Sequence, residues 1–320
     1  MNLDVAGAAA LLQKSDNILI LTHKNPDGDT LGSAAALCRA LHTLGKHARI
    51  ENSDSIPHKY DFLFADIPVQ EFEPAFVLAV DIADTKLLGE RLESLYADRV
   101  DLCIDHHQSN KHYARATLLE ADSAAAALPV YRVIHELGLE ITPAMATDLY
   151  TALSTDTGCF RYINANAEAY RIGAELIERG ANNADINVRM FETKPLSYFR
   201  LLSMVLDGMR LACEGQVAIL KVTRDMLDAT GATDDVCDAF AAMSRQIEGV
   251  KAGITMRQKK DGGYKISLRT HNELDASEIC AQLGGGGHKG AAGCDAGPDE
   301  EESLQLLLRF IAGKLGCGVE

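Results

Sequence analysis

Three short apolar runs constrain the fold of this chain more than any other feature of its sequence. They lie at residues 17–22 (NILILT), 76–81 (FVLAVD) and 100–105 (VDLCID) and are rich in Ile, Leu, Val and Ala. Such runs are typical of strands that are buried on both faces. Residues 47–51 indicate a further strand, and helical patterns lie at residues 33–44, 123–138 and 143–155. The alternation predicts an α/β domain in which helices cover both faces of a mainly parallel sheet.

A second α/β pattern occupies the last third of the chain. Residues 191–212 look helical without a strand, and strand patterns follow at 216–223, 250–258 and 264–270. Asp261-Gly262-Gly263 lies between the last two and predicts a hairpin turn. The 320 residues are enough for two domains. We therefore expect an N-terminal domain at 1–190, a helical connector at 191–212 and a smaller α/β domain at 213–320, with the active site in the cleft between the domains.

The composition excludes several classes of protein. The chain has 46 acidic and 31 basic residues, for a net charge of −15. Binding of long duplex nucleic acid by charge needs a basic surface, so we exclude that class, whereas a small anionic substrate met by metal ions fits. The 8 cysteines form no CxxC pair, which argues against zinc fingers and disulfide scaffolds and favours free thiols in a reducing cytoplasm. No run approaches the roughly 18 apolar residues of a membrane helix, so we expect no membrane span.

Acidic and imidazole side chains follow the predicted strands and one helix. Each has an ordinary explanation as a turn, a helix cap or a surface residue. Ligands of a parallel sheet bind beyond the carboxyl ends of its strands, however, so four such places together indicate a cation site. The residues are His23, Asp27 and Asp29 after the first run, Asp81 after the second, Asp105, His106 and His107 after the third, and Asp156 after the helical stretch.

Mixed imidazole and carboxylate ligands suit Mn²⁺ or a similar divalent ion, and the absence of thiolates argues against structural zinc. So many ligands suggest two ions. Two ions roughly 3.5–4 Å apart can activate a water and neutralise a phosphoryl group, which predicts a dinuclear phosphoesterase. Adjacent histidines on an extended chain point in opposite directions. We therefore expect His106 and His107 to divide the roles of metal ligand and substrate contact, with Asp105 orienting an imidazole.

The motifs, taken in order, resemble those of the DHH phosphoesterase family. HxNPDGDxxGS, VD, DHH and TDTGxFRY resemble its N-terminal domain, and SLR…GGGGHxxAAG resembles the associated C-terminal domain of its NrnA-type members, which act as oligoribonucleases and phosphatases of 3′-phosphoadenosine 5′-phosphate (pAp). The resemblance implies that His23, Asp27 and Asp81 hold one Mn²⁺, and that a second is held by Asp29, Asp81, His106 and Asp156. It places His107 beside the scissile phosphate, as general acid or electrostatic partner, with Asp105 behind it.

The C-terminal motifs supply candidate substrate contacts. A glycine run lets the backbone approach a phosphate, and an arginine can grip one in bidentate fashion. The resemblance assigns substrate binding to Arg269, Gly286, Gly287 and His288. We therefore expect hydrolysis of short RNA, of linear dinucleotides such as pApA, and of pAp. A family II-type inorganic pyrophosphatase, a cyclic-dinucleotide phosphodiesterase and a non-catalytic nucleotide or metal sensor stay open as alternatives, as does a homodimer.

Overall fold

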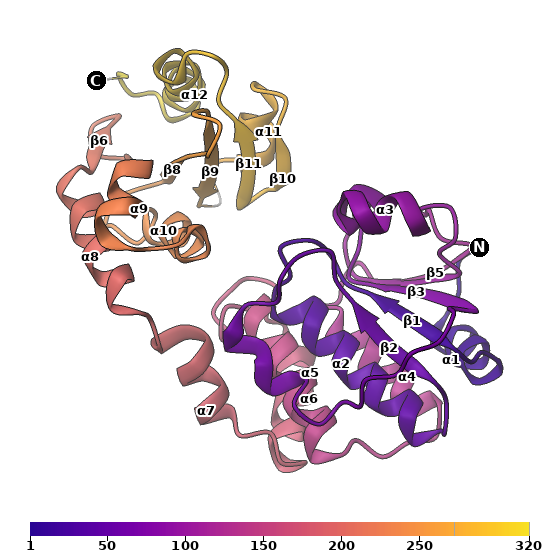
Figure 1. The fold of residues 1–320 in the computed structure, drawn as a ribbon. Coiled ribbons are helices and arrows are strands. Elements are labelled where there is room, and N and C mark those ends of the chain that lie inside the picture. Colours follow the sequence, from indigo (N-terminus) through magenta and orange to yellow (C-terminus); the bar gives the residue numbers. More distant parts are fainter. Residues whose placement is uncertain (272, 320) are drawn as a thin grey trace. The chain divides into compact units, whose positions relative to one another are not determined.

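The computed structural model describes residues 1–271 and 273–319, with the side chains of Asp235, Asp238 and His288 left out. The chain divides into two compact units, Met1–Thr193 and Lys194–Glu320, and each is described by itself (Figure 1). Both units combine helices with a sheet, so the predicted α/β class is confirmed.

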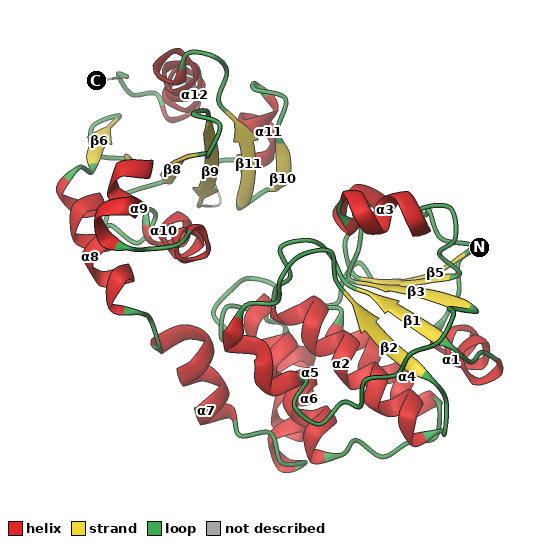
Figure 2. Ribbon diagram, viewed as in Figure 1, coloured by secondary structure: helices red, strands yellow, loops and turns green. Residues whose placement is uncertain are grey.

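The first unit contains a five-stranded parallel sheet (Figure 2). Its order is β2-β1-β3-β4-β5, so the chain moves to one side of β1 and then to the other. The predicted strands are present, and a short fifth strand that we did not predict pairs with β4. The strands are β1 (Ile18–Leu21), β2 (Ala48–Glu51), β3 (Phe76–Val80), β4 (Leu102–Asp105) and β5 (Ala116–Leu119).

Helices cover both faces of this sheet, which explains why its strands are apolar throughout. One face, with Ile18, Ile20 and Leu78, packs against a group of larger helices, and the other, with Leu19 and Val77, packs against α3. The larger helices are α1 (Val5–Lys14), α2 (Gly28–Thr43), α4 (Ala127–Glu136), α5 (Pro143–Asp156) and α6 (Ala167–Glu178). The others are α3 (Glu90–Tyr96), α7 (Asn183–Asn187), a π-helical turn at Val188–Glu192, and 3₁₀ turns at His58–Leu63 and Thr85–Leu88.

The second unit is built on a mixed six-stranded sheet of order β10-β11-β9-β8-β7-β6. β7 and β8 are parallel, and the other neighbouring pairs are antiparallel. Its strands are β6 (Arg210–Ala212), β7 (Val217–Val222), β8 (Ala252–Gln258), β9 (Tyr264–Thr270), β10 (Gly286–His288) and β11 (Ala291–Asp295). Helices α8 (Leu196–Asp207), α9 (Arg224–Thr230) and α10 (Asp238–Met243) share one apolar cluster, and α11 (Ala276–Ala281) and α12 (Glu300–Leu315) share another. A 3₁₀ turn covers Asp234–Cys237.

Two local expectations for this unit need correction or refinement. Residues 191–212 contain α8 but also β6, which pairs antiparallel with β7, so the expectation of no strand there was wrong. Three residues are too few for a strand pattern to stand out in a sequence. The predicted hairpin turn is present, with Gln258 paired to Tyr264 and the amide of Lys259 donating to the carbonyl of Gly263. No disulfide joins any of the eight cysteines, all of which lie in the described residues, and six of them are buried. In the described residues, every helix falls short of the length and apolar character that crossing a bilayer requires.

Gly32 allows α2 and α5 to approach closely. A Cβ at this position would lie 2.4 Å from the carbonyl oxygen of Asp148 and 3.0 Å from the Cβ of Ala152. We expect Gly32→Ala to lower the free energy of unfolding by about 1–3 kcal/mol, because overpacking forces these helices apart. Gly313 is the matched control: it lies in α12, and an added Cβ would meet nothing within 4 Å. Gly313→Ala should stabilise by about 0.5–1 kcal/mol. Urea unfolding measures both, and equal midpoints would contradict this packing.

Candidate metal centre

The predicted site residues converge at the switch point of the first sheet. β1 lies between β2 and β3, so the connections that leave its carboxyl end and that of β3 run in opposite directions. Such a point opens a crevice beyond the carboxyl ends of the strands. The loops after β1, β3 and β4 carry His23, Asp81 and His106 to this edge.

The loop after β1 places two carboxylates through helix α2. Asp27 caps that helix, its Oδ1 accepting hydrogen bonds from the amides of Asp29 and Thr30 at 3.0 and 3.2 Å. The same oxygen lies 3.5 Å from Nε2 of His23, so capping and site formation coincide in one side chain. Asp29 is buried in the first turn, and it accepts hydrogen bonds from Ser33 and from the amides of Ala126 and Ala127.

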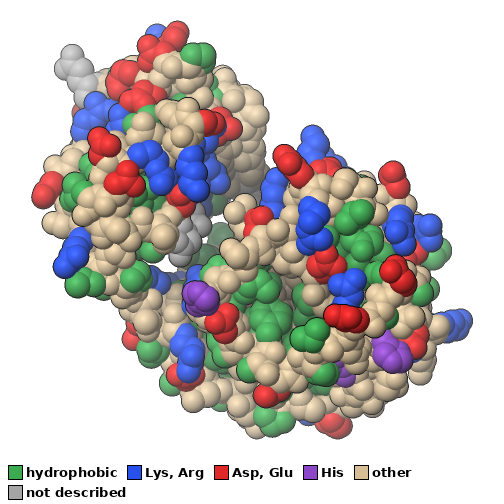
Figure 3. Space-filling model, viewed as in Figure 1, with side chains coloured by type: hydrophobic (Ala, Val, Ile, Leu, Met, Phe, Trp, Pro, Cys, Tyr) green, Lys and Arg blue, Asp and Glu red, His purple; other side chains and the backbone are tan. Residues whose placement is uncertain are grey.

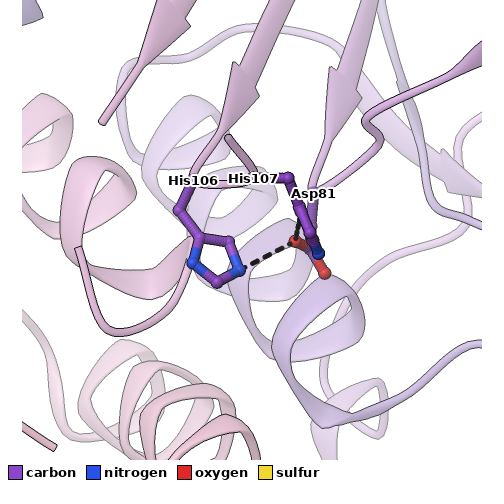
Figure 4. A group of neighbouring side chains, drawn as sticks. All are labelled: Asp81, His106 and His107. Atoms are coloured by element: carbon purple, nitrogen blue, oxygen red, sulfur yellow. Dashed lines mark ion pairs between the residues drawn. The ribbon is translucent and has the colours of Figure 1, made fainter. Parts of the chain in front are cut away.

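Asp81 occupies the centre of the group. Its φ of 63° lies in the left-handed region, which turns the chain sharply at the end of β3. The side chain is 3% exposed, and its Oδ2 lies 3.6 Å from Nε2 of His23. Its Oδ1 is buried and accepts no hydrogen bond, although nitrogens of His106 and His107 lie 3.5 and 3.4 Å away (Figure 4). A buried carboxylate oxygen without a donor is costly in protein alone and fits a cation ligand.

Asp105 shapes the turn that carries both histidines. Its Oδ1 accepts the amides of His106 and His107 at 2.8 and 3.2 Å and Nδ1 of His107 at 2.8 Å. Its Oδ2 accepts the side-chain amide of Asn110 at 2.6 Å. The two imidazoles therefore lie side by side, with ring centroids 4.5 Å apart, and both approach Asp81. The expectation of opposite directions was wrong, because β4 ends at Asp105 and both histidines lie in the loop that follows it.

Asp156 is the last residue of α5, and its side chain completes the group. Its Oδ2 lies 3.8 Å from Nε2 of His106. Within the described residues, three sets place one ligand atom per residue within 4.8 Å of one another: His23-Asp27-Asp81, Asp29-His106-Asp156 and Asp81-His106-His107. The six predicted ligands thus form two separate sets of three, and the contact between Asp81 of one set and His106 of the other connects them. Nδ1 of His107 is already held by Asp105, so the third set is the least suited to a cation.

Burial and crowding perturb the pKa values of these groups. Burial opposes charge on His23 and His106, but the contacts with nearby carboxylates outweigh it and raise the pKa of each to about 11. Burial, and then the charge of Asp81, raise the pKa of Asp29 well above its usual range. Burial raises the pKa of Asp156 to about 7. In the metal-free protein, protons therefore occupy positions that divalent cations would take over.

Metal loading should therefore release protons. Imidazole binds a cation only after losing its proton, and His23 and His106 hold theirs at neutral pH. We expect release of at least one proton per chain on loading with Mn²⁺, and an apparent affinity that rises as the pH rises. Calorimetric titration in buffers of different ionisation enthalpy measures this release. Heats that do not depend on the buffer would contradict it.

The candidate substrate residues lie in the second unit, on its β9-β11-β10 edge. Ala291 pairs with both Arg269 and His288, so the backbones of all three form one row across three strands. Gly286 and Gly287 belong to β10, where a Cβ on Gly287 would meet the carbonyl oxygen of Ala291 at 2.6 Å, whereas one on Gly286 would meet nothing within 4 Å. The last two glycines of the run thus belong to a paired strand. The side chain of His288 lies outside the described part of the chain.

The sequence did not predict the polar residues that hydrogen-bond to the candidate ligand side chains. Nδ1 of His106 lies 3.1 Å from the carbonyl oxygen of Ser123, and the side-chain amide of Asn164 donates to Asp156. Neither Ser123 nor Asn164 lies in a motif whose residue types alone indicate ligation. Asn110, whose side-chain amide donates to Asp105, was not predicted from the sequence either.

Comparisons with known proteins agree with this site. The N-terminal domain of the DHH family matches residues 17–153, and the DHHA1 domain matches 214–315. The bifunctional oligoribonuclease and PAP phosphatase NrnA of Thermus thermophilus is 34% identical, over 93% of this chain and 90% of its own length. An exopolyphosphatase-related protein from Bacteroides fragilis shares the fold with a TM-score of 0.88 and 23% identity, covering 97% of each chain. RecJ from Thermus thermophilus, solved with Mn²⁺, superposes with a TM-score of 0.52 and 17% identity, covering 98% of this chain and 55% of RecJ. The chain belongs to the DHH family of phosphoesterases.

Proposed function

We propose that this protein is an Mn²⁺-dependent phosphohydrolase that degrades short oligoribonucleotides and pApA-type dinucleotides to mononucleotides and converts pAp to AMP. One observation carries the proposal. All six predicted ligand side chains converge at one sheet edge, in a chain that matches a bifunctional oligoribonuclease and PAP phosphatase over 93% of its length. The free thiols suit a reducing cytoplasm, where we place the enzyme.

The donor set fits two divalent cations. His23, Asp27 and Asp81 would hold one, and Asp29, His106 and Asp156 would hold the other. The family resemblance adds Asp81 to the second set as a bridge, and its Oδ1 lies 3.5 Å from Nε2 of His106. When bound, such a pair neutralises charge on a phosphoryl group and activates the attacking water. Support for Mn²⁺ comes from the mixture of imidazole and carboxylate donors and from the Mn²⁺ in RecJ.

The chain's own groups would move the proton. Asp105 fixes His107 through Nδ1, so Nε2 is the nitrogen that we assign to the leaving oxygen of the phosphate. Burial opposes charge on His107, but the hydrogen bond to Asp105 outweighs it and raises the pKa of His107. A protonated His107 would donate to the leaving oxygen as a general acid, or stabilise its charge.

Arg269 is the proposed phosphate grip of the second unit. We expect Arg269→Ala to raise KM for pApA about 10- to 100-fold, since a charge-assisted hydrogen bond contributes about 1.5–3 kcal/mol. Metal content should not change, because the predicted ligands all belong to the other unit. Arg210→Ala is the matched control, from exposed β6 of the same sheet. Steady-state kinetics beside metal analysis tests the assignment, and unchanged KM would remove Arg269 from the site.

Long duplex nucleic acid is not a proposed substrate. The net charge is −15. On the faces drawn in Figure 3, basic and acidic side chains are interspersed, with no continuous basic stripe. Such a surface gives little of the counterion release on which duplex binding depends.

A substrate panel tests the proposed function. The Mn²⁺-loaded chain would be assayed in parallel with pAp, pApA, a five-nucleotide RNA and inorganic pyrophosphate. We expect AMP or mononucleotides to be released and pyrophosphate to stay intact. Fast hydrolysis of pyrophosphate with inert nucleotides would replace the proposal by an inorganic pyrophosphatase. Bound metal without turnover of any substrate would indicate a sensor.

A further inference from the structure

We infer that Asn164 is a positioning residue that fixes the carboxylate of Asp156 for one of the two cations. The inference rests on the proposed metal centre. Asp156 needs such support more than Asp29 of the same set, because it ends helix α5 and its side chain is 29% exposed, against 1% for Asp29.

The side-chain amide of Asn164 connects two elements of the site. Its Nδ2 donates to the carbonyl oxygen of Ala124 at 2.9 Å, and to the carbonyl oxygen and Oδ2 of Asp156 at 3.2 and 3.3 Å. An amide nitrogen carries two hydrogens. One can serve Ala124 while the other is shared between the two oxygens of Asp156, which fixes the carboxylate relative to its own backbone.

The backbone between these two residues is bent into an unfavourable conformation that brings Asn164 back to Asp156. Gly158, Cys159 and Phe160 have φ angles of 57°, 59° and 58°, so three consecutive residues are left-handed. For residues other than glycine this region costs about 1–2 kcal/mol each. Hydrogen bonds from the amides of Cys159 and Phe160 to Ser154 and Thr157 hold the turn. Strain that is maintained beside a functional group points to a role for the residue it places.

The partner of Asn164 belongs to a segment that holds other ligands. In residues 123–127, the carbonyl oxygen of Ser123 lies 3.1 Å from Nδ1 of His106. The amides of Ala126 and Ala127 donate to both carboxylate oxygens of Asp29. Through Asn164 the same segment also reaches Asp156. Residues 123–127 therefore set the mutual positions of Asp29, His106 and Asp156, which form one of the two candidate sets.

This arrangement predicts a selective effect. Asp156 takes part in the set with Asp29 and His106, and not in the set of His23, Asp27 and Asp81. Removing a group that orients a ligand typically lowers metal affinity about 10- to 100-fold. Loss of the Asn164 amide should therefore lower the affinity for one of the two Mn²⁺ ions by this factor. The affinity for the other ion should not change. A residue that only stabilised the loop would affect neither equivalent.

The experiment is a calorimetric titration of metal-free protein with Mn²⁺. Wild type would be compared with Asn164→Ala and with Asn164→Leu, which keeps the approximate shape of asparagine without its donor. Asn166→Ala is the matched control, because Asn166 caps helix α6 through the amides of Glu168 and Ala169 and touches no candidate ligand. The control should lower the unfolding temperature and bind both equivalents normally.

We expect wild type to bind two equivalents of Mn²⁺. Each Asn164 variant should bind one of these two equivalents more weakly than wild type does. Either Asn164 variant that folds and binds both equivalents with wild-type affinity would overturn the positioning role alone. A wild-type chain that binds no Mn²⁺ would overturn the proposed metal centre and the positioning role with it.

Discussion

Asp81→Asn should reduce the rate of pApA hydrolysis by on the order of 1000-fold. The variant should also lose the ability to bind two Mn²⁺ ions per chain. One carboxylate lies between both candidate sets, 3.6 Å from His23 and 3.5 Å from His106. Its loss weakens the binding of both cations, and the two cations together supply several kcal/mol of transition-state stabilisation. Asparagine is the suitable replacement, because it tolerates the left-handed φ of 63° better than alanine.

Thermal unfolding separates this effect from misfolding. A ligand present at 100 times its Kd stabilises a protein by about 2.7 kcal/mol. Wild type should gain stability of this order from Mn²⁺, and Asp81→Asn should gain much less. The metal-free variant should stay folded, because the attraction of Asp81 to three imidazoles is opposed by its repulsion from the carboxylate of Asp29. Asp66→Asn, at an exposed position, is the control. Two tightly bound Mn²⁺ ions in Asp81→Asn would contradict its bridging role.

His107→Gln should lower kcat about 10²- to 10⁴-fold, the range for loss of a general acid. Metal affinity should remain, because Nδ1 of His107 is committed to Asp105 at 2.8 Å. His58→Gln, at a fully exposed histidine, is the matched control. A kcat that is unchanged in His107→Gln would remove the residue from catalysis.

The role of His107 as a general acid also predicts how the rate changes with pH. A general acid must be protonated, so the rate should fall as the pH rises through the pKa of His107. Asp105 stabilises the imidazolium and raises that pKa. Asp105→Asn should therefore move the alkaline limb of the profile to lower pH. A limb that stays in place would show that another group limits the rate at high pH.

The sheet and the convergence of the candidate ligands could be predicted because both depend on local pattern. A strand that is buried on both faces must be apolar along its length, and a charged residue directly after it must lie at the sheet edge. Asp81 and Asp105 illustrate this, and the parallel pairing of β1, β3 and β4 brings their ends together. β6 escaped prediction because its three residues are too few for a recognisable pattern. β5 is as long as β1, but its sequence, Ala-Thr-Leu-Leu, has only two strongly apolar residues.

The supporting contacts could not be predicted because they depend on tertiary placement. Asn164 reaches Ala124 across 40 positions of sequence, and Ala126 reaches Asp29 across 97. Asn110 and Asp105 are close in sequence, but their contact depends on how the chain leaves β4. The relative orientation of His106 and His107 was predicted wrongly for the same reason, since the backbone turns at Asp105.

Titration of the metal-free chain with Mn²⁺, followed by initial rates on pApA, tests the central claim most directly. The two candidate ligand sets predict no turnover without metal and a rate that rises until two equivalents are bound per chain. Full activity in the presence of a chelator, or a plateau at one equivalent, would contradict a dinuclear phosphoesterase.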